Sequence, residues 1–100
     1  MQSWFETWTL LRMQHAELDA LVAGNVRAQR ARRRMTQQQL ADELDWSRAS
    51  VLSLENDARR VTLSDVVDLC RALEIPLAEL LAGAPDDVTQ QLGIDRRGRS

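Results

Sequence analysis

The chain has no lysine, no tyrosine, one phenylalanine and one cysteine. With so few aromatic rings, a stacking platform for single-stranded nucleic acid is not expected. A lone cysteine excludes an intramolecular disulfide and is typical of a cytoplasmic protein. No stretch approaches the roughly 20 apolar residues needed to span a bilayer, so no membrane association is expected. The amino terminus lacks the basic segment and clean apolar run of a signal peptide.

The sequence also has few combinations of residues typical of catalytic or metal-binding sites. The single histidine, His15, and the single cysteine, Cys70, are far apart in the sequence, and both fall on apolar stripes. There is no glycine-rich phosphate loop, no arguable pair of catalytic carboxylates and no second histidine or cysteine at metal-ligand spacing. We therefore expect no enzyme, no metal and no cofactor, and we expect Cys70 to be a small core residue.

What the chain does have is enough apolar sequence for one small domain, with 44% hydrophobic residues in 100. Its formal net charge of -2 argues against indiscriminate binding to nucleic acid. The charges are unevenly placed, however, because arginines cluster within residues 27–60 and acidic residues dominate residues 65–87. One end of the domain is therefore expected to be positive and suited to approach phosphates.

Residues 36–56 predict two short helices joined by a tight turn. Thr36 can cap the first helix, with Gln39 reaching back at capping-box spacing, and Ser47 can cap the second. The inward-facing positions are Leu40, Ala41 and Leu44, then Val51, Leu54 and Glu55. Two such short helices with so short a join must cross. That is the helix-turn-helix arrangement, whose second helix can enter a DNA major groove.

The region from Val26 to Leu81 resembles the helix-turn-helix domain of the phage repressor/Cro family, also called the xenobiotic-response-element (XRE) type. The matching pieces are R-x-x-R at Arg27 and Arg30, M-T-Q-x-x-L-A at 35–41, S-R-A-S-V at 47–51, L-E-N at 54–56, T-L-S-D-V-V-D-L-C-R-A-L at 62–73 and I-P-L-A-E-L-L at 75–81. The resemblance implies an all-α, five-helix, lambda repressor-like domain that usually binds DNA as a dimer.

The sequence divides into three expected parts: an N-terminal amphipathic helix over 1–24, the helix-turn-helix domain over 25–83 and a C-terminal tail over 84–100. Gly24 is expected to end the first helix, and Asn25 to cap a second one that runs to about Arg34. Later helices are expected over 63–74 and 77–82, with one more turn over 86–92. The positions expected to be buried on the 63–74 helix are Leu63, Val66, Val67, Cys70 and Leu73.

The N-terminal helix lies outside the resemblance and carries an apolar stripe of its own. Its positions step by four and three, at Trp4, Trp8, Leu11, His15, Leu18 and Val22, with Phe5 and Leu21 widening the stripe. The stripe can pack on its own domain, form the seam of a dimer or bind a different protein. Met13 is a second candidate translation start.

The resemblance also assigns roles to single residues. Arg30 matches an arginine that pairs with the glutamate near the end of the reading helix, here Glu55. Gln37 and Asn56 match positions that contact DNA phosphates. Asp45 stands where a glycine is usual, and we expect the turn to survive because aspartate tolerates a left-handed backbone better than most residues. Trp46, bulky where a small residue is usual, is expected at the core or its rim.

The expected DNA-contacting residues are Gln37, Gln38, Ser47, Arg48, Ala49, Leu52, Ser53, Asn56, Arg59 and Arg60. Arg48 can make a bidentate contact to guanine, and Ala49 can meet a thymine methyl group. Leu52 can do the same or can mark a protein-contacting face. Arg59 and Arg60 are expected to contact phosphates. Leu77, Leu80 and Leu81 on the last helix of the domain are candidates for a dimer contact or for simple core packing.

These observations favour a sequence-specific regulator of transcription that binds double-stranded DNA. We expect a cytoplasmic homodimer that acts as a repressor on an inverted-repeat operator. The alternative is an antitoxin-like or protein-interaction module, in which the Trp-rich N-terminal helix over residues 1–23 binds a partner protein and DNA binding is secondary.

Overall fold

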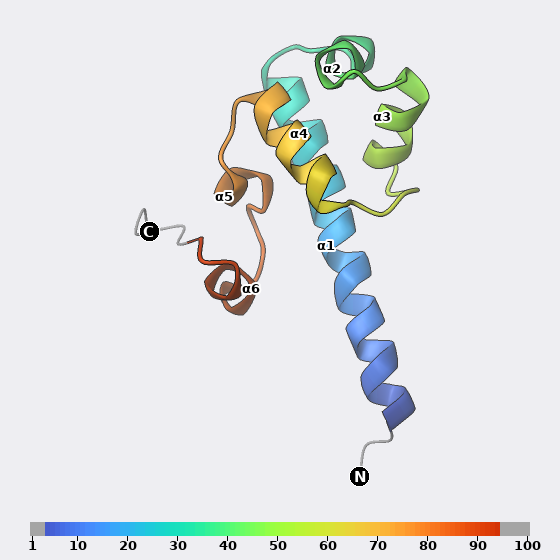
Figure 1. The fold of residues 1–100 in the computed structure, drawn as a ribbon, viewed down its shortest axis with the longest axis vertical. Coiled ribbons are helices and arrows are strands. Elements are labelled where there is room, and N and C mark those ends of the chain that lie inside the picture. The colour runs from blue at the N-terminus through green and yellow to red at the C-terminus, as the bar shows by residue number, and fades with distance from the viewer. Residues whose placement is uncertain (1–3, 95–100) are drawn as a thin grey trace.

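The computed structural model describes residues 4–94, with side chains from residue 16 onward. All regular elements in this part are helices: α1 (Trp4–Arg32), α2 (Gln37–Leu44), α3 (Arg48–Glu55), α4 (Leu63–Leu73), α5 (Leu77–Leu80) and α6 (Asp86–Gln91). The all-α fold class is therefore confirmed. α2 and α3 lie at the carboxyl-terminal end of the long α1, while α5 and α6 lie on the other side of α4 (Figure 1).

α1 runs without a break through Gly24, so the predicted helix end at this residue is wrong and the expected boundary at 24/25 falls inside a helix. Glycine inside a helix costs roughly 1 kcal/mol, which the buried neighbours Val22 and Val26 outweigh. Asn25 caps no new helix. Its side-chain amide donates to the carbonyl oxygens of Leu80 and Ala82 at 2.7 and 2.9 Å, where α5 ends and leaves carbonyls without helical partners.

The core lies where the helices meet, and the predicted inward stripes of α2 and α3 are confirmed. Its buried side chains are Val22, Val26, Leu40, Ala41, Leu44, Val51, Leu54, Leu69, Leu73, Ile75, Leu80, Leu81 and Ala84. The capping box at Thr36 and the Ser47 cap form as the sequence predicts, and Thr62 forms a second capping box with Asp65. Local capping signals and apolar spacing therefore agree on where the short helices begin and which face they bury.

α4 is turned differently from the prediction. Leu63 and Val67, expected to be buried, are 80% and 44% exposed, whereas Asp65, Leu69 and Leu73 are buried. The reason is Asp65, which completes the capping box and faces inward at the first turn, so the buried stripe follows from it at helical spacing. Cys70 packs against the core as predicted, and partial burial raises the pKa of its thiol.

Part of the segment expected to be a C-terminal tail, residues 84–100, packs on the domain. Ala84 is buried, and Val88 and Ile94 pack against the core, so the expected boundary at 83/84 falls within packed structure. Leu80 and Leu81 are core residues, which removes them as dimer contacts and leaves Leu77 half-buried. Within residues 4–94, no helix combines the length and apolar character that a membrane crossing requires.

Candidate nucleic-acid interface

The turn between α2 and α3 depends on a left-handed residue. Asp45 has φ 57° and ψ 39°, and its backbone N–H donates to the carbonyl oxygens at the end of α2. The N–H of Trp46 then donates to the carbonyl of Ala41 at 2.9 Å. The prediction that aspartate can replace glycine here is confirmed, because its short polar side chain tolerates this conformation at low cost. The turn sets the crossing of the two helices.

Glu55, 1% exposed at the end of α3, joins three helices. Its carboxylate accepts from Arg30 Nε at 2.7 Å and Arg30 Nη2 at 3.0 Å, a bidentate ion pair with α1. It also accepts from Gln37 Nε2 at 3.2 Å, from the first turn of α2. Arg30 Nη1 further donates to the carbonyl of Met35 at 2.9 Å. The ion pair expected between Arg30 and Glu55 is therefore present, and it orients α3 against α1 and α2.

The outer face of α3 carries the expected readers. Val51, Leu54 and Glu55 are buried, so the helix turns its opposite face outward. The residues on or beside that face are Ser47, Arg48, Ala49, Leu52, Ser53 and Asn56, all exposed apart from the half-buried Ser53. The hydroxyl of Ser47 is already engaged, since it accepts from Ser50 N–H at 3.1 Å. Arg48 is the one long cationic side chain on this face among the described residues.

The two glutamines at the start of α2 differ in their partners. Gln37 is half-buried and bonded to Glu55, so it is fixed in place beside α3. Gln38 is exposed and donates to Asp42 at 2.9 Å, one turn along its own helix. Gln37 is therefore already positioned, whereas Gln38 would have to leave Asp42 in order to reach another group.

Arg59, expected to contact a phosphate, already has partners within the domain, and its side chain keeps 32% exposure. Nη2 pairs with Asp65 at 3.0 Å, and the guanidinium stacks over the Trp46 ring at 4.7 Å from the centroid. Trp46 is half-buried against the core, as predicted for a core or rim residue. Together these side chains tie the turn before α3 to the start of α4. Arg60, next in sequence, is exposed and forms no such pair with any residue whose side chain the structure describes.

Arg27 was missed as a member of this side of the molecule. Its Nη1 donates to the backbone carbonyl of Glu55, which places an exposed arginine at the carboxyl end of α3. The available signal was the three-residue spacing of Arg27 and Arg30, which puts both on the same face of α1. Arg27 thus satisfies one of the unpaired carbonyls at the end of the helix.

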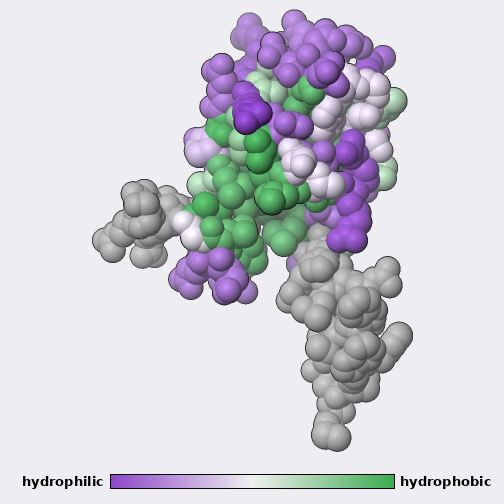
Figure 2. Space-filling model, viewed as in Figure 1, coloured by the Kyte–Doolittle hydropathy of each residue, from purple (hydrophilic) through white to green (hydrophobic). Residues whose placement is uncertain are grey.

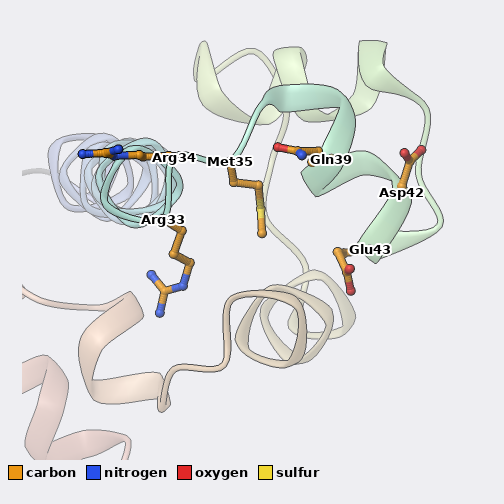
Figure 3. A pocket seen from close by; sticks show the side chains of 6 residues that line it. All are labelled: Arg33, Arg34, Met35, Gln39, Asp42 and Glu43. Carbon is orange, nitrogen blue, oxygen red and sulfur yellow. The ribbon is translucent and has the colours of Figure 1, made fainter.

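A shallow pocket of about 330 Å³ lies on the other flank of α2. It is lined by Arg33, Arg34, Met35, Gln39, Asp42 and Glu43. Figure 3 shows the two arginines at the end of α1 and the two acidic residues across from them on α2. Arg33 already donates to Gln29 at 2.5 Å. With two cations and two anions around it, the pocket gives no preference for a charged ligand, and it is separate from the outer face of α3.

A helix-turn-helix family model matches residues 26–80, which is more than half of the chain. The chain belongs to this helix-turn-helix family, of the XRE type. The recognition made from the sequence motifs is therefore confirmed. Membership also supports the coarser functional prediction, that of a DNA-binding regulator of transcription.

Two solved structures resemble this member of the family. A hypothetical transcription factor, NHTF from Neisseria, is 27% identical with a TM-score of 0.62, over 75% of this chain and 84% of that one. The restriction-modification controller protein C.AhdI from Aeromonas hydrophila is also 27% identical, with a TM-score of 0.59, over 62% of this chain and 94% of that one. A search of curated proteins gave no significant match.

Proposed function

We propose that this protein regulates transcription by binding double-stranded DNA in a sequence-specific manner, as a cytoplasmic homodimer that represses by occupying an inverted-repeat operator. The observation that carries the proposal is α3, with its inner face buried and its outer face exposed beside the fixed Gln37. Two such helices about 34–36 Å apart would read successive major grooves on one side of the duplex. The proposal assigns a binding role and no catalysis.

Arg48 is the proposed base reader, with Ala49 and Leu52 meeting thymine methyl groups and Asn56 meeting phosphate. A bidentate arginine–guanine contact discriminates by ~1–3 kcal/mol.

Selection from random duplex DNA should return an inverted repeat. Arg48→Ala should then lose the preference at one base pair of each half-site. Arg60→Ala should weaken binding to every sequence alike and flatten its salt dependence. The matched control is Arg71→Ala, an exposed arginine on α4. If Arg48→Ala and Arg60→Ala behaved identically, direct readout by Arg48 would be wrong.

A reporter gene placed behind the selected operator tests the sign of regulation. Repression by occupancy predicts lower expression with the protein present and recovery with Arg48→Ala. Increased expression would reverse the proposed sign while leaving DNA binding intact.

The protein-interaction alternative stays open, because the first half of α1 extends beyond the other helices (Figure 1). A different protein that co-purifies in stoichiometric amount, and is lost when residues 1–15 are deleted, would favour this alternative.

A further inference from the structure

The contacts of α1 show which of its faces is turned toward the rest of the domain. The carboxylate of Asp19 accepts from Val61 N–H at 3.3 Å, just before α4 begins. Leu21 packs at Gly83, where an added β-carbon would lie 3.3 Å from Leu21 Cδ1. At 100° per residue, Val22 lies on the helix face between these two contacts, and it is 3% exposed. This face therefore points toward α4, α5 and the segment leading to α6.

The sequence continues the same stripe toward the amino terminus. Counting back from Val22 by four and three reaches Leu18, then Leu11, Trp8 and Trp4 beyond His15. The backbone of α1 over this stretch projects away from the other helices (Figure 1). Since α1 is one continuous helix, its first half cannot fold back onto its own domain. Packing on its own domain is therefore removed as the fate of the stripe in this half of α1, although Val22, at the other end of the stripe, is part of the core.

An exposed apolar surface lies close to where α1 leaves the domain. Leu63 is 80% exposed and Val67, one turn further along α4, is 44% exposed. Val61, two residues before Leu63, is the residue bonded to Asp19 of α1. Figure 2 shows hydrophobic residues gathered on this side of the molecule, around α4 and α5. Such a surface on a small domain marks a contact site.

We propose that the first half of α1 in each protomer packs against the Leu63–Val67 surface of a second copy. Each copy carries one of each surface, so a two-fold axis satisfies both and leaves no open end. Trp4, Phe5 and Trp8 together could bury roughly 450–750 Å², at about 150–250 Å² per aromatic side chain. That approaches the ~800 Å² that each partner contributes to a stable interface. The inference rests on the dimeric state in the proposed function, and on none of its DNA contacts.

Sedimentation of the full chain without DNA, over a wide concentration series, tests this arrangement. The wild type should reach twice the protomer mass of 11.4 kDa. Trp8→Glu and Leu63→Glu should each raise the dimer dissociation constant by roughly 30-fold or more, as expected for a central contact. Leu63 is 80% exposed, and circular dichroism will check that each variant folds. The control is Leu52→Glu, which makes the same leucine-to-glutamate change on the exposed face of α3 and should leave the mass unchanged.

Mixing the two variants is the decisive measurement. In a heterodimer of the two variants, one contact pairs the substituted α1 of one protomer with the substituted α4 surface of the other. The second contact then pairs an unchanged α1 with an unchanged α4 surface. The mixture should therefore form heterodimers under conditions in which each variant alone is a monomer. A monomeric wild type, a dimer that survives both changes, or a mixture that stays monomeric would overturn the inference. An intact dimer that selects no DNA sequence would count against the proposed function alone.

Discussion

The two sides of α1 are held by different kinds of interaction. On the α2–α3 side, the carboxylate of Glu55 accepts hydrogen bonds from Arg30 and Gln37, and Asp45 sets the turn between the helices. On the side of α4 and α5, apolar side chains such as Leu69 and Leu80 are fully buried. The side-chain hydrogen bonds of α1 described on this side, those of Asn25 and Asp19, are with backbone groups and not with a charged partner.

This difference matches what each side has to do. Apolar packing is strong but tolerates rotation and repacking, whereas bidentate hydrogen bonds fix one orientation. A helix that reads base edges must hold its angle to the rest of the domain. The polar junction at Glu55 supplies that angle, and the apolar side contributes stability through burial.

The largest effect is expected from Glu55→Ala. Removal of the carboxylate leaves the Arg30 guanidinium facing the interior without its partner, at a cost of about 3–5 kcal/mol. Arg30 retains 22% side-chain exposure, which favours the lower end of this range. For a domain of this size, thermal denaturation followed by circular dichroism should show a melting temperature lower by more than ~12 °C.

Glu55→Gln is the matched control, since it keeps the shape of the side chain and one acceptor oxygen. Its loss should be clearly smaller than that of Glu55→Ala. Equal losses would mean that the charge of Glu55 contributes nothing, and an unchanged melting temperature in both variants would remove the junction as the source of orientation.

Leu69→Ala should cost about 3 kcal/mol, because it opens a cavity in the apolar side of the core. Its consequence for DNA binding sharpens the comparison. Well below the melting temperature, the folded fraction should retain its operator affinity, since α3 keeps its contacts with Arg30 and Gln37. Glu55→Ala should lose affinity even when folded. Binding titrations at low temperature on both variants will show whether the two sides separate in this way.

The elements of the domain could largely be predicted from the sequence, because their signals are local. The cap at Thr36, the cap at Ser47 and the apolar spacing of α2 and α3 act over one or two turns. The Arg30–Glu55 pair joins residues far apart in sequence, and it came from the family resemblance, not from spacing.

The errors have a common physical source, which is tertiary contact overriding a local preference. Gly24 and Asn25 form a good stop-and-start signal, yet the packing of Val22 and Val26 carries α1 through it. The contacts of Arg59 with Asp65 and Trp46 were not predicted either, because the fold alone brings these side chains together; its expected phosphate contact stays a prediction. Neither partner lies at a helical spacing from Arg59, so the sequence does not predict the contact.

Asp65→Ala should cost about 1–2 kcal/mol, less than either core change. It removes a capping-box partner of Thr62 and the anion that holds Arg59 over Trp46. Arg59→Ala should cost less, because the Thr62–Asp65 cap remains. Chemical denaturation of both variants will rank them. A larger loss for Arg59→Ala would show that the stacking on Trp46, and not the cap, holds α4 to the turn.

The smallest effect is expected at the turn itself. Asp45 is exposed and has a left-handed backbone conformation. Asp45→Gly should change the free energy of unfolding by no more than about 0.5 kcal/mol, because the relief of backbone strain is offset by the greater freedom of the unfolded chain. Asp45→Ala should destabilise by about 1 kcal/mol, because alanine shares the strain without a polar side chain to offset it. Equilibrium unfolding of both variants separates backbone conformation from side-chain loss. If alanine were as stable as glycine, the left-handed turn would not be what sets the crossing of α2 and α3, and orientation on this side would rest on Glu55 alone.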